Sequence, residues 1–332
     1  MRTAIVGDGS WGTTLALLLH GNGHRVTLWS AFPENAQAIG KDRENRAFLP
    51  GIPLPPEIRA TADLKIAVGQ AEAIVLATPT QFLDEVVESL AKLPEIAAKL
   101  WVNVAKGIEL KTCRRPSRIV EDRLGRLPFC TLSGPSHAEE VARGIPTAVV
   151  AASPDPAVAK TACDLFMNDF FRVYTSPDLT GVELGGALKN VYAIAAGVCD
   201  GMGLGDNSKA ALLTRAIAEM ARLGESLGGA PETFSGLGGV GDLIVTCASR
   251  HSRNRHVGEA IGRGRSLAEI GQEMGRVVAE GVTTTLSARD LALRHRVETP
   301  IVEEVYQVLY RNKDPKQAVR QLMTREPKAE MA

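Results

Sequence analysis

The stretch TAIVGDGSWGTTLALLL, residues 3–19, places three glycines between two apolar runs. The run before the glycines is short and partly β-branched, which is typical of a buried strand, and the run after them has the character of a helix. Gly7 lets the chain turn tightly off the strand, Gly9 has no Cβ to obstruct an approaching group, and Gly12 lets the helix pack close to the sheet. The order strand, glycine turn, helix predicts the start of a parallel α/β domain.

A G-x-G-x-x-G turn in this setting is typical of dinucleotide binding. The free N–H groups and the positive dipole end of the helix face the pyrophosphate. The motif alone is weak evidence, because glycine-rich βα turns also occur where no nucleotide binds. We expect NAD or NADP at this turn.

The composition limits the partners of the chain. Its 332 residues suit two domains. Lys plus Arg and Asp plus Glu number 38 each, so no overall charge favours nucleic acid or an anionic membrane. The five cysteines are scattered and form no CxxC pair, so we expect neither a disulfide framework nor a zinc site, and a reducing cytoplasm fits best. No apolar run has the length of a membrane helix, so we expect no transmembrane segment.

Short β-branched runs alternate with helical periodicity over the first half of the chain. This alternation predicts βα units and a doubly wound, mainly parallel sheet in a domain of residues 1–175. The expected strands are Thr3–Val6, Val26–Trp29, Ala73–Ala77, Trp101–Val104, Phe129–Leu132, Ala148–Ala151 and Phe170–Tyr174.

Strand signals almost vanish after this point. We therefore expect an all-α second domain over residues 176–332, with a charged tail after Thr324 that frays. The expected helices are Leu179–Val198, Asn207–Leu227, Leu267–Met274, Thr284–Arg294 and Ile301–Tyr310.

One expected helix carries a cation on an otherwise apolar surface. Residues 184–198 read LGGALKNVYAIAAGV, where only Lys189, Asn190 and the Tyr192 hydroxyl are polar. A helix that is apolar all round is buried, and burial lowers the pKa of a lysine toward the range useful for proton transfer. The alternative is an ammonium that reaches solvent or closes a structural ion pair.

Two further segments follow expected strands, at the sheet edge where open α/β folds bind ligands. Lys106 comes directly after the fourth strand, although a surface lysine beside a turn glycine explains it equally well. The segment SGPSHAEE, residues 133–140, opens a short helix with hydroxyls and N–H groups. In it Ser136 is a plausible helix cap even without a ligand, and His137 is better explained as structural than as catalytic.

A glycine-dense loop, residues 236–241, carries Asp242 into the next helix. The basic run Arg250–His256 follows. Such a run is usually a solvated face, and the zero net charge argues against nucleic acid. Ser252, Arg253 and Asn254 suit one small phosphate better, because Arg offers a bidentate fork and its neighbours add neutral donors.

Taken together, these segments resemble the NAD(P)-dependent glycerol-3-phosphate dehydrogenases, closest to the bacterial type. The resemblance runs from GDGSWGT (7–13) through VAKG (104–107), SGPSHA (133–138), LGGALKN (184–190), GDL (241–243) and SRNR (252–255) to VAEG (278–281). It implies a Rossmann domain and a helical C-terminal domain of the 6-phosphogluconate-dehydrogenase-like type. It also implies a homodimer that interconverts dihydroxyacetone phosphate and sn-glycerol 3-phosphate, the backbone of glycerophospholipids.

The resemblance assigns roles position by position. Lys189 matches the general acid/base, with Lys106, Asp242 and Thr246 in the same catalytic polar network. The substrate contacts it implies are Lys106, Gly134, Ser136, Lys189, Asn190, Asp242, Ser252, Arg253 and Asn254. The cofactor contacts expected from the glycine turn and from the resemblance are Gly7, Gly9, Ser10, Trp11, Gly12, Lys106, Ala138, Arg253, Val278 and Glu280.

The sequence departs from the bacterial pattern after the second strand. The stretch WSAFPE, residues 29–34, has no basic residue for the 2′-phosphate of NADP and no acid at the strand end for the ribose of NAD. Phe32 could stack on adenine. We therefore favour NAD, or use of both cofactors, over strict NADP.

Two alternatives remain open at this point. Another two-domain dehydrogenase, of the β-hydroxyacid or 6-phosphogluconate type, would place a substrate carboxylate where this chain offers a phosphate site. A redox-sensing module would bind the dinucleotide without turnover and would have no use for a buried Lys189 beside Asp242.

Overall fold

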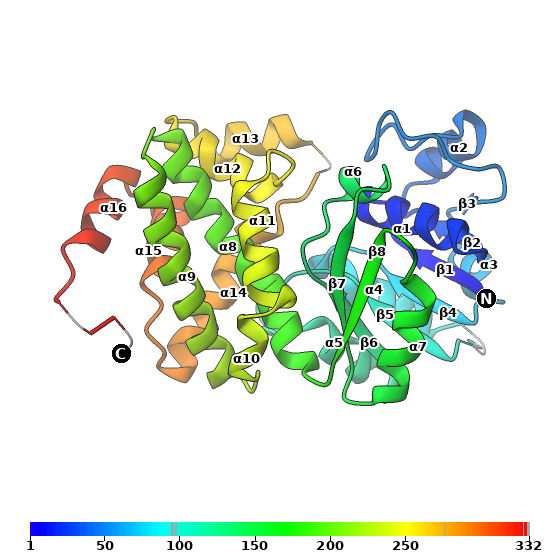
Figure 1. Ribbon diagram of the computed structural model, residues 1–332. Helices are drawn as coiled ribbons and strands as arrows, with labels where there is room; N and C mark the ends of the chain where they lie inside the picture. Colours follow the sequence, from blue (N-terminus) through cyan, green and yellow to red (C-terminus); the bar gives the residue numbers. More distant parts are fainter. Residues whose placement is uncertain (94–95, 97, 276, 328, 331–332) are drawn as a thin grey trace.

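The computed structural model describes residues 1–93, 96, 98–275, 277–327 and 329–330. Its two halves lie side by side: a sheet flanked by helices holds the N-terminus, and a helical bundle holds the C-terminal end (Figure 1). The predicted α/β domain followed by an all-α domain is therefore confirmed as the fold class.

The sheet has eight strands in the order β3-β2-β1-β4-β5-β6-β7-β8. Neighbouring strands are parallel except for the antiparallel pair β6 and β7. Their bounds are β1 Arg2–Val6, β2 Arg25–Trp29, β3 Arg59–Thr61, β4 Ala73–Leu76, β5 Leu100–Asn103, β6 Phe129–Ser133, β7 Thr147–Ala152 and β8 Phe171–Ser176.

Both faces of this sheet are covered. Successive strand residues point to opposite faces, so Ile5 joins one hydrophobic cluster while Ala4 and Val6 join the other. Leu15 of α1 packs in the first cluster and Leu83 of α4 in the second. The helices of this half are α1 Ser10–Gly21, α2 Pro33–Asp42, α3 Leu64–Val68, α4 Thr80–Ala91, α5 Pro116–Leu124, α6 Ala138–Val141 and α7 Pro156–Phe166.

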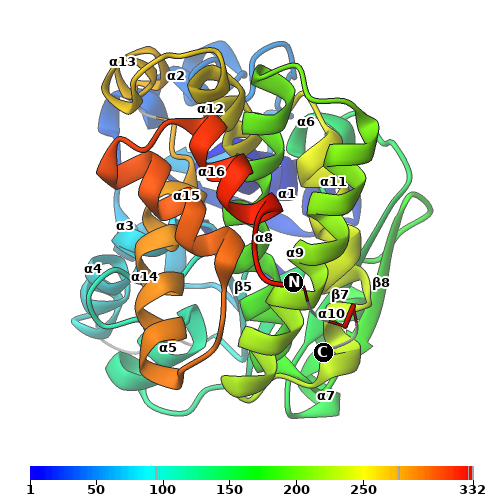
Figure 2. The same cartoon turned by 90° about the vertical axis from the view of Figure 1, so that its left-hand side faces the viewer.

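The helical half is built around α8, Leu179–Gly201, which runs through the middle of the bundle (Figure 2). Glycines let α8 and α12 touch backbone to backbone. A Cβ on Gly197 would lie 2.0 Å from the Arg255 carbonyl oxygen, and one on Gly258 would lie 1.9 Å from that of Ile194. The other elements are α9 Asp206–Ser226, α10 Pro231–Phe234, the π-helical turn η1 Leu237–Gly241, α11 Asp242–Ala248, α12 Arg253–Gly262, α13 Leu267–Met274, α14 Glu280–His295, α15 Pro300–Arg311 and α16 Pro315–Met323.

Three local expectations need correction or addition. The glycine-dense segment before Asp242 is not a loop but the turn η1, which packing holds in place: a Cβ on Gly239 would lie 2.2 Å from the Phe234 carbonyl oxygen. The basic run enters α12, whose glycines obscure its helical pattern. Several short elements were not expected from the sequence, among them β3, a three-residue strand at the sheet edge, and α16.

The structure describes only part of the charged tail. Residues 328 and 331–332, which belong to the predicted frayed tail, lie outside the described residues. Within the described part, the Arg215 side chain donates to the Glu330 carbonyl oxygen over 2.8 Å. None of the helices that the structure describes has both the length and the apolarity needed to cross a membrane.

Candidate active site

The three glycines of the first turn have different surroundings. Gly7 has φ +126°, and a Cβ on it would lie 2.7 Å from the Ala77 backbone. A Cβ on Gly12 would lie 2.0 Å from the Gly7 carbonyl oxygen, whereas one on Gly9 would meet nothing within 4 Å. No side chain caps the N-terminus of α1. The turn therefore leaves open space and free N–H groups at Gly9, as a pyrophosphate requires.

A buried polar cluster supports this turn from behind. The Asp8 carboxylate accepts from Asn35 Nδ2 at 2.5 Å, and Asn45 Nδ2 donates to the Asp8 carbonyl oxygen and to Thr13 Oγ1 at 2.7 and 2.8 Å. Burial raises the pKa of Asp8 above its usual value. Sequence reasoning missed this cluster, because Asn35 and Asn45 are distant in the chain and carry no motif.

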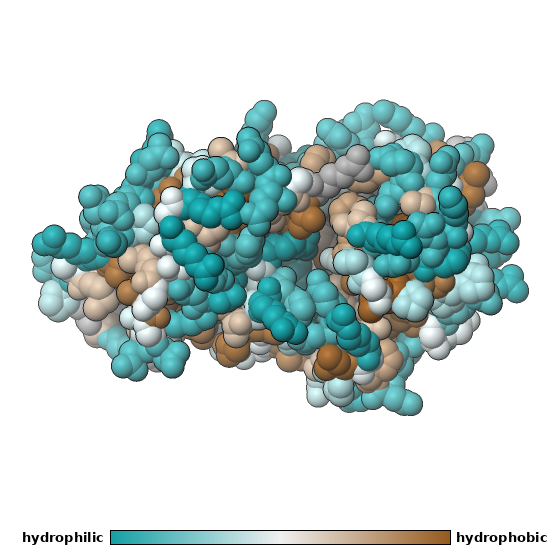
Figure 3. All heavy atoms as spheres, turned by 90° about the horizontal axis from the view of Figure 1, so that it is seen from above, coloured by the Kyte–Doolittle hydropathy of each residue, from teal (hydrophilic) through white to brown (hydrophobic). Residues whose placement is uncertain are grey.

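A cleft opens between the two halves, and the surface seen from above is indented there (Figure 3). Several residues that sequence reasoning did not expect line it, among them Thr78, Pro79, His137, Glu139 and His251. The expected site residues that line it are Gly9, Ser10, Trp11, Gly12, Lys106, Ser136, Ala138, Lys189, Asn190, Thr246, Ser252, Arg253, Asn254, Val278 and Glu280.

The Lys189 amine lies at the floor of the cleft. Lys189 Nζ donates to Asp242 Oδ1 over 2.8 Å and to Thr246 Oγ1 over 2.7 Å. Burial lowers the pKa of Lys189 to about 8; Asp242 opposes this shift, and the charge of Lys106 adds to it. An amine with this pKa can exchange a proton near neutral pH.

Asp242 joins two lysines from opposite halves. Its Oδ2 accepts from Lys106 Nζ at 2.7 Å and from Ser133 Oγ at 3.4 Å. Burial alone would raise the pKa of Asp242, but Lys106 and Lys189 outweigh it and hold the pKa below its ordinary value. Asp242 is therefore a carboxylate that fixes both amines, and it lies behind the cleft lining.

Gly134 and Ser136 shape the position of Lys106. The Gly134 carbonyl oxygen accepts from Lys106 Nζ and from Ser136 Oγ, each at 2.9 Å. Gly134 has φ +135°, a backbone conformation that favours glycine. Gly134 therefore acts through its carbonyl group and, like Gly7, lies behind the cleft lining.

Two asparagines tie the site residues together. Asn190 Nδ2 donates to the Lys106 carbonyl oxygen, and Asn254 Nδ2 donates to Asn190 Oδ1, each over 2.9 Å. Asn254 Oδ1 accepts from the Gly281 N–H at 2.9 Å. This relay links α8 and α12 to the start of α14 and to the segment that carries Lys106.

Arg253 is the cation of the cleft best placed for an external anion. It is the first residue of α12, and Ser252 caps that helix by accepting from the Arg255 N–H at 3.2 Å. Among the described residues, no hydrogen bond or ion pair engages the Arg253 guanidinium. Desolvation lowers its pKa, while the charges of Glu280 and Glu139 act in the opposite direction. An unpaired guanidinium in this setting suits a phosphate.

Glu280 leaves one acceptor open on the cleft wall. Its Oε1 accepts from the Thr80 N–H at 2.9 Å, while Oε2 is buried and has no hydrogen-bond partner among the described residues. Burial raises the pKa of Glu280 to about 7. Within the part of the chain that the structure describes, Trp11 Nε1 is likewise buried without a hydrogen-bond partner. An open acceptor and an open donor on the cleft wall fit a bound group that brings its own amide and hydroxyl groups.

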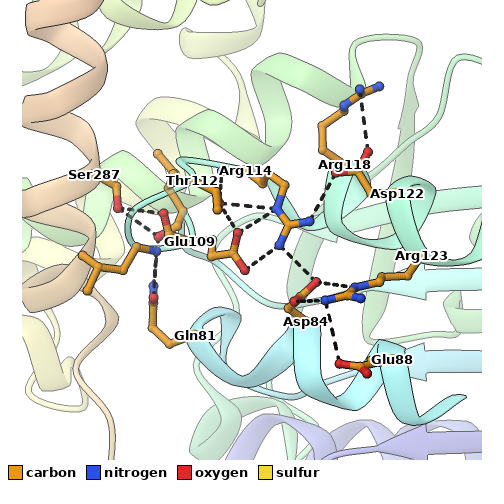
Figure 4. Close-up of polar contacts among 12 residues, drawn as sticks. Gln81, Asp84, Glu88, Glu109, Thr112, Arg114, Arg118, Asp122, Arg123 and Ser287 are labelled. Atoms are coloured by element: carbon orange, nitrogen blue, oxygen red, sulfur yellow. Dashed lines mark hydrogen bonds and ion pairs between the residues drawn. The ribbon is translucent and has the colours of Figure 1, made fainter. Parts of the chain in front are cut away.

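The segment after β5 carries Lys106 and has no regular structure of its own. Side chains satisfy its backbone: Gln81 donates to the Ile108 carbonyl oxygen and accepts from the Leu110 N–H, each at 2.9 Å, and Ser287 donates to the Glu109 carbonyl oxygen over 3.0 Å (Figure 4). These contacts come from α4 and α14. Both halves of the molecule therefore hold this segment.

An ion-pair network extends this anchoring. Arg114 Nε donates to Glu109 Oε2 over 2.7 Å, and Arg114 also pairs with Asp84 at 3.0 Å and Asp122 at 3.2 Å (Figure 4). Asp84 pairs in turn with Arg123. The far end of the segment is thus fixed to α4 and α5.

Phe32 lies away from the cleft lining. It precedes α2, and its ring lies against that of Phe48 with centroids 6.5 Å apart. Within the part of the chain that the structure describes, no group of three His, Cys, Asp or Glu side chains is arranged to hold a metal ion.

Comparisons with known proteins agree along the whole chain. Residues 2–159 match the profile of the NAD-dependent glycerol-3-phosphate dehydrogenase N-terminus, and residues 178–320 match that of its C-terminus. A protein of Chlorobium limicola named glycerol-3-phosphate dehydrogenase, NAD(P)+, is 50% identical over 100% of both chains. One of the same name from Moorella thermoacetica is 51% identical over 97% of this chain and 95% of its own.

Solved structures show the same likeness. The crystal structure of glycerol-3-phosphate dehydrogenase from Coxiella burnetii has a TM-score of 0.94 and 38% identity, covering 98% of this chain and 99% of that one. A D-mandelate dehydrogenase, with a TM-score of 0.65 and 14% identity over 96% of this chain and 99% of its own, shares the fold.

Proposed function

Since the chain belongs to the NAD-dependent glycerol-3-phosphate dehydrogenase family, we propose that it reduces dihydroxyacetone phosphate to sn-glycerol 3-phosphate and catalyses the reverse reaction. The observation that carries this proposal is the combination, in one cleft, of Lys189, held by Asp242, with Arg253, whose guanidinium has no ion-pair partner among the described residues. A proton donor and an anion site at the same opening are what reduction of a phosphorylated ketone needs.

The glycine turn and the open polar atoms around it fit a nicotinamide dinucleotide, either NAD or NADP. Gly9 and the N-terminus of α1 would hold the pyrophosphate, Ser10, Trp11, Ala138 and Val278 would line its path, and Glu280 Oε2 would accept a hydrogen bond from it. When bound, this cofactor supplies or accepts the hydride. Phe32 would lie toward the adenosine end.

Lys189 handles the proton. As an ammonium it donates a hydrogen bond to the substrate C2 oxygen, stabilises the negative charge that develops there, and gives up its proton. Asp242 keeps the amine oriented, and Thr246 accepts its second hydrogen bond. Lys106 adds positive charge from the opposite wall. In the oxidative direction the neutral amine takes the proton from the C2 hydroxyl.

The phosphate anchors the substrate away from the reacting carbon. Arg253 would bind it bidentately, and Asn254 and Ser252 would add the donors that their structural bonds leave free. This remote binding positions C2 against Lys189, so part of the barrier is overcome by orientation.

Three further assignments are part of the proposal. The domain boundary lies near residue 175, since β8 ends at Ser176 and α8 begins at Leu179. A homodimer is expected from the family resemblance. The five free cysteines support a cytoplasmic location, because a reducing compartment keeps thiols unpaired.

The test is oxidation of NADH and NADPH by the purified protein with dihydroxyacetone phosphate, followed by the loss of nicotinamide absorbance. Turnover with this ketone, and not with 2-oxo or 3-oxo acids, is expected. Turnover with the acids alone would favour a carboxylate-directed dehydrogenase. Tight NADH binding without any turnover would favour a redox-sensing module.

A further inference from the structure

Two histidines face each other across the cleft. His137 precedes α6 in the sheet half, and His251 lies between α11 and α12 in the helical half. Their ring centroids are 6.0 Å apart, with the planes tilted by 52°. Both rings line the cleft that holds Lys189 and Arg253.

The His137 ring contacts the helical half of the molecule. Its Nε2 faces the Val245 carbonyl oxygen at 3.5 Å. Burial and the nearby Lys189 charge lower the pKa of His137, while the Val245 carbonyl oxygen, Glu139 and Asp242 act in the opposite direction. This shift favours the uncharged ring, which offers His251 a packing surface across the cleft.

The main chain also places His251 on the Arg253 side of the cleft. The His251 N–H donates to Ser249 Oγ over 3.1 Å, and the Ser252 N–H donates to the Ser249 carbonyl oxygen over 3.2 Å. This turn leads directly into the cap of α12, two residues before Arg253. His251 and Arg253 therefore share one rim of the cleft.

The phosphate site has room for another donor. The Asn254 amide already donates to Asn190 and accepts from Gly281, and the Ser252 hydroxyl already accepts from Arg255. One N–H and one O–H remain on these two side chains. A phosphate monoester presents three terminal oxygens with several acceptor positions, which Arg253 and these two groups do not fill.

We propose that His251 donates a ring N–H to the substrate phosphate beside Arg253, and that His137 positions the His251 ring from the opposite half. The inference rests on the proposed function, whose phosphate site it completes. It also means that both halves of the molecule contribute to phosphate binding.

The test measures the KM for dihydroxyacetone phosphate, kcat, and competitive inhibition by inorganic phosphate. In His251→Ala, the KM and the phosphate inhibition constant should rise together by about tenfold, the usual worth of one hydrogen bond to a charged group, while kcat stays within about twofold. His251→Gln retains an N–H donor and should recover part of the loss. Arg250→Ala is the matched control, because Arg250 is exposed and does not line the cleft.

The positioning role of His137 is tested by combining its substitution with His251→Ala. His137→Ala should raise the phosphate inhibition constant by about threefold in the wild-type background and have no further effect in His251→Ala, because coupled residues are not additive. His137→Phe keeps a ring opposite His251 and should stay near wild type.

A failure of the proposed function can be told apart from a failure of the inference about His251. If the wild-type protein does not turn over dihydroxyacetone phosphate, the proposed function is wrong. If it does, and folded His251→Ala has wild-type KM and phosphate inhibition, the inference about His251 is wrong while the function stands. An additive effect of His137→Ala in the His251→Ala background would overturn the positioning role.

Discussion

Replacement of Lys189 by Met tests the assignment of the proton donor most directly. Met keeps the apolar stem of the side chain and removes the amine that bonds Asp242 and Thr246. The forming alkoxide then has no positioned proton donor. We expect kcat for reduction to fall by about 10²–10⁴, the usual worth of such a donor.

The fold should tolerate this change. Burial makes the charged form of Lys189 less favourable than in water, and it lowers the pKa to about 8 even though Asp242 opposes the shift. Met carries no such penalty. Asp242 still has Lys106 at 2.7 Å, so its carboxylate is not left without a cation. We expect the Tm to change by less than about 5 °C, because the lost ion pair and the removed penalty oppose each other.

The assay combines thermal melting with steady-state rates. Lys209→Met is the matched control: Lys209 pairs with Asp200 at 2.8 Å in the same half of the molecule and does not line the cleft. It should keep wild-type kcat. A Lys189→Met enzyme that melts normally and keeps more than about a tenth of kcat would refute the assignment, since a positioned donor is worth far more. Lys106 would then be the next candidate.

Four further outcomes are expected. Because the pKa of Lys189 is about 8 and reduction uses the ammonium, the pH profile of reduction should be level below pH 8 and fall above it, and that of glycerol 3-phosphate oxidation should rise over the same range; identical profiles would contradict the role. Arg253→Ala should raise the KM for dihydroxyacetone phosphate about 10- to 100-fold, and an unchanged KM would remove Arg253 from the phosphate site. Phe32→Arg should raise the NADPH/NADH ratio of kcat/KM by supplying a cation for the 2′-phosphate; a constant ratio would show that Phe32 lies elsewhere. Gln81→Leu removes the two hydrogen bonds that Gln81 makes to the Lys106 segment and should lower kcat about tenfold with little change in NADH affinity, whereas an unchanged kcat would show that the contacts from Ser287, Asn190 and Arg114 are enough to hold it.

The sequence predicted best those features whose signal is local. The strand before Gly7 and the helix after it follow from apolar periodicity and glycine placement, and the long central helix follows from its apolar faces. The three-residue strand β3 is too short to show a period of its own. The helix α12 escaped prediction because Gly258 and Gly262, which interrupt its pattern, are explained only by contact with α8.

In the candidate site too, only the residues with a local sequence signal could be predicted. Lys189 could be singled out from sequence because a cation on an apolar helix is conspicuous. Its pairing with Asp242 depends on how α8 and α11 pack, which no local pattern encodes. Gln81 contacts the Lys106 segment, and His137 contacts His251. Each contact joins segments far apart in the chain, so no local pattern predicts it. Such residues become visible only when the halves are placed together.

The glycine contacts between α8 and α12 have a consequence for the range of substrates. Lys189 is carried by the first helix and Arg253 by the second, and the two backbones touch at Gly197 and Gly258 without intervening side chains. The spacing of the two helix axes is therefore set by main chain that cannot be compressed and has no side-chain packing to rearrange. Any adjustment to a longer or shorter substrate must then come from the long side chains of Lys189 and Arg253, because the helices that carry them cannot approach each other more closely.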